Sequence, residues 1–140
     1  MTLEAWFWIA HVPALAGWLA LIILPANRGV RLARWAAALL AFGYLLLFLF
    51  FARDTLVLVR EYGLGGVAAW FDIPGLMLLG WVHYLAFDLF VGSWEAEEGA
   101  RSGVPRAVLI PCLILTCMLG PLGLLAFLVA RRLRNNSIAS

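Results

Sequence analysis

Charged side chains divide the chain into four long apolar runs, which cover residues 6–24, 35–52, 73–92 and 107–130. At a rise of about 1.5 Å per residue, a helix over each run is roughly 27–36 Å long, enough to cross a hydrocarbon core of about 30 Å. A membrane barrel would instead need many alternating strands of about ten residues. The pattern therefore predicts an all-α fold, a bundle of four transmembrane helices.

The segments between the runs predict the shorter features. Residues 53–72 mix apolar and charged side chains around a cluster of glycines, which predicts a short interfacial helix, a turn and a lead into the third span. Residues 94–105 end in Ser-Gly-Val-Pro, a sequence typical of a turn. We expect residues 1–134 to form a single membrane domain and residues 135–140 to be a polar C-terminal tail.

The fourth run contains a glycine-proline pair near its middle. Pro121 should kink the helix because it lacks a backbone N–H, and the kink would free the carbonyl of Cys117. Gly120 and Gly123 flank the kink and would let a neighbouring helix approach closely. Cys112 and Cys117 are five positions apart on this helix, so a strain-free disulfide between them is not expected.

Composition supports a membrane protein and removes other classes. The 140 residues are 65% hydrophobic and only 13% charged, whereas an average soluble domain carries about 25% charged residues. The formal net charge is +2, and the ten basic residues, all arginine, are scattered along the chain. Binding to nucleic acid is therefore not expected.

The arginines do not define the orientation of a four-span protein. One side of the membrane would hold Arg53, Arg60, Arg131, Arg132 and Arg134, and the other would hold Arg28, Arg31, Arg34, Arg101 and Arg106. Under the positive-inside rule this is a tie. The arginine cluster that follows the last run favours both termini in the cytoplasm.

Two histidines and one carboxylate fall inside the runs: His11, His83 and Asp88. Such residues usually face a bundle interior or a cavity and are candidates for function. Asp88 is about 8 Å further along the helix than His83 and about 140° around it, so the two do not form a close pair. His83 could act as a general acid or base, with Asp88 and either Tyr44 or Tyr84 holding or relaying the proton.

A structural interpretation stays open for the same residues. Asp88 could form an ion pair with one of the three arginines that precede the second run, and His83 could bond to a neighbouring helix. Haem ligation by His11 and His83 is disfavoured because they differ in depth by about 6 Å. A metal site that adds Asp88 would have to join groups about 14 Å apart in depth. No metal or cofactor is therefore expected.

Sequence motifs connect the chain with a known family. The third run contains W-x-H-x-x-x-x-D-L-F, here Trp81, His83, Asp88, Leu89 and Phe90, and the fourth run contains Gly120-Pro121-x-Gly123. Together with Pro25-Ala26-Asn27-Arg28 after the first run, they resemble the abscisic-acid-deficient-four-like family over nearly the whole chain. Its plant members are small four-helix plastid membrane proteins required to form neoxanthin from violaxanthin.

The resemblance implies an acid–base isomerisation that needs no redox cofactor or metal. Opening a carotenoid epoxide to an allene protonates the epoxide oxygen and removes a proton from the neighbouring polyene carbon. His83 and Asp88 would be the catalytic residues. The candidates for binding the polyene are Trp81, Tyr84 and Phe87, together with Tyr44 and Thr116, which lie at matching depth.

The sequence thus predicts a multi-pass protein of the bacterial cytoplasmic (inner) membrane that acts on a carotenoid or a related isoprenoid lipid. The alternative is a non-catalytic membrane protein that binds lipid or pigment or serves as a scaffold, in which His83 and Asp88 are structural. The sequence leaves open whether the protein forms an oligomer and what His11 does.

Overall fold

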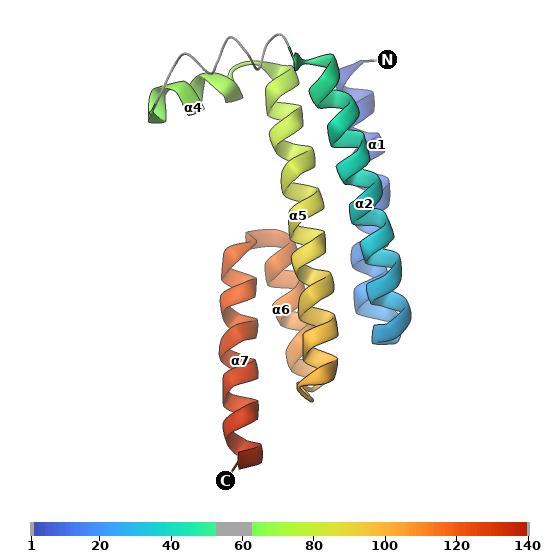
Figure 1. The fold of residues 1–140 in the computed structure, drawn as a ribbon, viewed down its shortest axis with the longest axis vertical. Coiled ribbons are helices and arrows are strands. Elements are labelled where there is room, and N and C mark those ends of the chain that lie inside the picture. Colours follow the sequence, from blue (N-terminus) through green and yellow to red (C-terminus); the bar gives the residue numbers. More distant parts are fainter. Residues whose placement is uncertain (1, 53–62, 140) are drawn as a thin grey trace.

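The computed structural model describes residues 2–52 and 63–139, and within these ranges every regular element is a helix, as predicted. The elements are α1 (Leu3–Ile23), α2 (Ala26–Phe50), α4 (Leu64–Phe71), α5 (Pro74–Arg101), α6 (Arg106–Leu119) and α7 (Pro121–Ala139). Three of them, α1, α2 and α5, are long and apolar enough to cross a membrane. These three helices pack side by side (Figure 1).

The three long helices approach closely where small residues face a neighbour. A side chain at Gly29 of α2 would collide with the carbonyl of Ala20 in α1. A side chain at Gly92 of α5 would collide with the ring of Trp18 in α1. Lipid tails are as apolar as the side chains, so such close van der Waals contacts, rather than the hydrophobic effect, hold membrane helices together.

The apolar runs locate the apolar part of each long helix but not the helix ends. α2 begins at Ala26, ahead of three arginines, and α5 continues to Arg101 through most of the predicted connection 94–105. Arginine and glutamate are good helix formers, so these helices extend beyond the apolar part of their sequence. The predicted turn is confined to residues 102–105, where Gly103 has a positive φ of 70°.

The prediction of one kinked helix over residues 107–130 is wrong. α6 ends at Leu119, the chain reverses at Gly120, and α7 returns beside α6 (Figure 1). Gly120 has a φ of 50° and a ψ of −104°, which favours glycine, and Pro121 begins the next helix, where its missing N–H is not needed. The 14 residues of α6 span roughly 21 Å, which is too short for a hydrocarbon core of about 30 Å.

The reversal places the two termini at opposite ends of the bundle (Figure 1). Arg131, Arg132 and Arg134 therefore join the end where α2 begins and α5 finishes, which raises its count to eight arginines. The other two arginines, Arg53 and Arg60, lie outside the described residues. The tie is broken, and the expectation that both termini share one side does not hold.

α4 projects sideways from the end of α5 near the N-terminus, away from α1 and α2 (Figure 1). It begins after Gly63, which has a φ of 98°, and it packs against α5. Leu64, Val67 and Phe71 are exposed, an arrangement typical of a helix at a membrane surface. The sequence predicted the interfacial helix ahead of the glycine cluster, in a segment outside the described residues, and predicted only a lead into the third span here.

Candidate functional site

Asp88 lies beside the tip of the hairpin formed by α6 and α7. A Cβ atom at Gly120 would be only 3.3 Å from the Oδ2 atom of Asp88, so the reversal of the chain sits directly against this carboxyl group. The Oδ2 atom is buried and has no hydrogen-bond partner among the described residues. α7 begins at Pro121, next to Gly120, and the N-terminal end of a helix favours nearby negative charge.

Glu95 is a second acidic residue on the same side of α5, two helical turns beyond Asp88. It is completely buried, and its two carboxyl oxygens are 2.9 and 3.0 Å from the hydroxyl of Thr116 in α6, which donates the hydrogen bond. The carboxyl groups of Glu95 and Asp88 are close enough to interact electrostatically. Asp88, Glu95, Thr116 and Tyr84 together form what we call the α5–hairpin cluster.

Sequence reasoning missed Glu95 because the third apolar run ends at Gly92. The signal was the spacing of seven residues from Asp88, which places two residues on one face of a continuous helix. This spacing is informative only if the helix is continuous from Asp88 to Glu95, and the sequence predicted that a connection begins at residue 94. Thr116, which the sequence predicts as a substrate contact, donates a hydrogen bond to this carboxyl group.

The prediction that the Cys117 carbonyl is free of a helical hydrogen bond is confirmed, and this carbonyl bonds to Tyr84 instead. The hydroxyl of Tyr84 donates a hydrogen bond of 3.1 Å to the carbonyl oxygen of Cys117. The same side chain also interacts with the carboxyl group of Asp88. Tyr84 therefore connects α5 to the end of α6, immediately before the chain reverses.

Neither carboxyl group of the α5–hairpin cluster forms an ion pair with a described residue. Arg34, which we considered as a partner for Asp88, instead pairs with Glu97. Glu98 forms ion pairs with two arginines, Arg101 at 2.7 Å and Arg131 at 3.2 Å. The arginine bridge proposed for Asp88 is therefore not found, and the cluster is held by hydrogen bonds from hydroxyl groups.

The uncompensated burial of Glu95 gives a prediction about stability. Burying a charged carboxylate without a cation is costly, so Glu95→Gln should change the free energy of unfolding by less than about 1 kcal/mol. Glu95→Ala leaves a cavity and a buried Thr116 hydroxyl without its partner, so it should cost about 2–4 kcal/mol. Thermal unfolding of the purified protein in detergent measures both. A loss for Glu95→Gln as large as for Glu95→Ala would mean that the charge itself is required.

His83 faces a different side of α5, toward α2 and the surrounding membrane. It is exposed, its ring stacks on Phe87 with centroids 4.4 Å apart, and the ring of Tyr44 in α2 lies 5.9 Å away. The matching depth of His83 and Tyr44 is thus confirmed. His83 and Asp88 are not brought together, as their spacing on the helix predicted.

His11 has a structural explanation. Its Nε2 atom accepts a hydrogen bond of 3.2 Å from the indole N–H of Trp81, and its Nδ1 atom lies 2.7 Å from the carbonyl oxygen of Phe7. Both contacts are satisfied when the ring is neutral and carries its proton on Nδ1. Trp81, predicted as a substrate contact, thus joins α5 to α1 through His11, and it also lies 5.4 Å from the ring of Tyr84. Within the described part of the chain, no group of three or more His, Cys, Asp and Glu side chains could hold a metal ion.

These features define a helical membrane protein with a polar cluster where a broken helix meets a long one, and with a histidine exposed on the opposite side. The family model described as ABA4-like, ABA DEFICIENT 4-like, matches residues 5–127. The chain belongs to this family. No curated protein and no solved structure matches it significantly.

Proposed function

We propose that the protein binds a carotenoid or a related isoprenoid lipid at its membrane-facing surface and isomerises it by proton transfer. The observation that carries the proposal is the position of His83, an exposed imidazole near the middle of the apolar run 73–92, in a helix long enough to span the membrane. Phe87 stacks on one side of it and Tyr44 lies nearby. Such a surface suits a flat polyene, because aromatic side chains bind it while the imidazole reaches its reacting atoms.

The proposed reaction moves protons without a net change of charge or oxidation state. His83 accepts the proton that leaves the polyene carbon, and the hydroxyl of Tyr44 donates a proton to the epoxide oxygen as its bond to carbon breaks. Transfer of the proton from His83 back to Tyr44 restores both groups. The centroids of the His83 and Tyr44 rings are 5.9 Å apart, which places both groups beside the same part of a bound substrate.

Asp88 enters the proposal as a second proton-transfer group, on another side of α5. A substrate that reaches Asp88 would lie between α5 and the α6–α7 hairpin, beside Tyr84. Both side chains are only partly buried, and Tyr84 already interacts with the carboxyl group. Substituting His83 and Asp88 separately distinguishes these two approaches.

A non-catalytic lipid-binding or pigment-binding protein is the second candidate. The hydrogen bonds of Glu95, Tyr84 and His11 favour it, because each of these side chains links two helices. In that case His83 and Tyr44 would only contact the ligand. We also propose that the protein resides in a bacterial cytoplasmic membrane, with its arginine-rich end in the cytoplasm.

The molecules that co-purify with the protein test both candidates. An absorption spectrum and a mass spectrum of the lipid extract should show an isoprenoid lipid or carotenoid at about one molecule per chain when the host makes such lipids. His83→Gln should retain the ligand, because Phe87 and Tyr44 still contact it. The variant should accumulate the unreacted isomer, because the glutamine amide cannot accept the proton. An extract that contains only ordinary phospholipid would contradict the proposal.

A further inference from the structure

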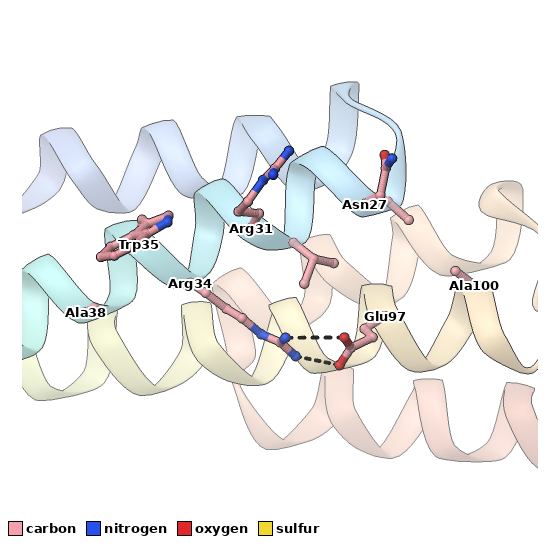
Figure 2. Close-up of a pocket in the computed structure, with 9 residues that line it drawn as sticks. Asn27, Arg31, Arg34, Trp35, Ala38, Glu97 and Ala100 are labelled. Atoms are coloured by element: carbon pink, nitrogen blue, oxygen red, sulfur yellow. Dashed lines mark hydrogen bonds and ion pairs between the residues drawn. The ribbon is translucent and has the colours of Figure 1, made fainter.

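A cleft opens between α2 and α5 at the arginine-rich end of the bundle (Figure 2). Its volume is about 650 Å³. The side chains that line it come from the first turns of α2 and from the end of α5, and they include Asn27, Arg31, Arg34, Trp35 and Glu97. Trp35 is 72% exposed, as expected of a tryptophan at a membrane interface. The cleft therefore opens at the depth of lipid headgroups.

The cleft carries more positive charge than the described residues neutralise. Arg34 reaches across to Glu97 and donates two hydrogen bonds, of 3.3 and 2.5 Å (Figure 2). Its Nε atom is buried and has no acceptor among the described residues. Arg31 forms no ion pair in the part of the chain that the structure describes, and Figure 2 shows its side chain directed away from Glu97. One of the two arginines is therefore left without a counter-ion.

A second, apolar groove continues from the cleft toward the middle of the membrane. Its volume is about 420 Å³, and it shares Arg34 and Ala38 with the cleft. The other residues that line it are Ala37, Ala41, Ala86, Phe87 and Phe90. The small alanine side chains leave a channel on the surface of α2 and α5 that ends at Phe87, whose ring stacks on His83. A polar, cationic opening that leads into an apolar channel matches a lipid with a charged headgroup and a hydrocarbon chain.

We propose that the cleft and the groove together bind one anionic phospholipid, with the phosphate at Arg31 and one acyl chain along the alanines. A phosphate diester supplies the counter-ion that Arg31 lacks and an acceptor for the side-chain amide of Asn27. This site goes beyond the proposed function and does not depend on it. The positive-inside rule adds support, because it places this end in the cytoplasm, and anionic lipids of a cytoplasmic leaflet attract clustered arginines.

Lipid titration of the purified full-length protein, followed by native mass spectrometry, tests the site. Phosphatidylglycerol should bind more tightly than phosphatidylcholine. Arg31→Gln should weaken phosphatidylglycerol binding about fivefold, since one arginine near a lipid headgroup contributes about 1 kcal/mol. Arg132→Gln, which removes the same charge from α7 outside the cleft, is the matched control and should leave the affinity unchanged. Ala38→Phe, which fills the junction of cleft and groove, should also weaken phosphatidylglycerol binding.

Each outcome of this experiment decides for or against the site. If Arg31→Gln and Arg132→Gln lower the affinity for phosphatidylglycerol equally, the effect is one of general charge and the site is overturned. Equal affinity for the two lipids would also overturn it, because the headgroup would then not be recognised. If inorganic phosphate displaces phosphatidylglycerol completely and Ala38→Phe has no effect, the cleft binds a free phosphate ion and not a lipid. Arg31 and Ala38 are both exposed, so their substitution should not prevent folding, and the thermal unfolding temperature of each variant checks this.

Discussion

A reporter fused to the C-terminus is expected to lie on the opposite side of the membrane from a reporter fused to the N-terminus. Three helices are long and apolar enough to cross the membrane, and α7 runs back beside α6 toward the end of the bundle where α6 begins. The end with eight arginines should face the cytoplasm. A fluorescent protein that folds only in the cytoplasm should therefore be bright at the C-terminus, and alkaline phosphatase, which is active only outside it, should be active at the N-terminus.

The connection between α1 and α2 provides the internal control for this experiment. A single cysteine at Asn27 should have the same accessibility to a membrane-impermeant thiol reagent as a cysteine at Ser140, once Cys112 and Cys117 are replaced by alanine. Matching accessibility of the two termini would show four crossings, as the apolar runs alone predict. It would also show that the hairpin opens into a continuous span in the membrane.

Gly123→Ala is expected to destabilise the protein by at least about 2 kcal/mol, because overpacking at a tight contact typically costs about 1–3 kcal/mol and here the backbone itself is the obstacle. A Cβ atom at position 123 in α7 would collide with the backbone nitrogen, the Cα atom and the Oγ1 atom of Thr116 in α6. The two helices would have to move apart. Since Thr116 also holds Glu95, the α5–hairpin cluster would be disturbed at the same time.

Gly43→Ala is the matched control for this variant. The position lies in the interior of α2, and an added Cβ atom there would meet nothing within 4 Å, so the change should be neutral or slightly stabilising. Thermal unfolding in detergent gives the comparison. If the two alanine variants unfold at the same temperature, α6 and α7 are not packed backbone to backbone.

The sequence predicted the elements whose cause is local. Apolar runs between charges located the membrane-crossing parts of α1, α2 and α5, because hydrocarbon excludes charge whatever the tertiary contacts. The comparison of depths brought Tyr44 level with His83, since each lies near the middle of its apolar run. The missing N–H of Pro121 correctly indicated a free carbonyl at Cys117, which Tyr84 now occupies.

The reversal at Gly120 depends on contacts that the sequence does not display. A glycine-proline pair is compatible with a kink or with a turn, and the choice is made by the approach of Gly123 to Thr116 and by the hydrogen bond between Thr116 and Glu95. Glu95 was overlooked for a related reason. An apolar run ends at the first cluster of charged residues. A carboxyl group beyond that point can still be buried in the bundle when another helix covers it and supplies a hydrogen-bond donor.

Conversion of a carotenoid epoxide by the purified protein in liposomes tests the proposed function most directly. Wild-type protein should yield an isomer of identical mass with a changed visible spectrum, and His83→Gln should reduce the rate at least about 100-fold, which is the lower range for loss of a general acid or base. Glu95→Gln, which keeps the hairpin packing, should retain activity. Absence of any isomer with the wild-type protein, or full activity of His83→Gln, would contradict proton transfer at this histidine.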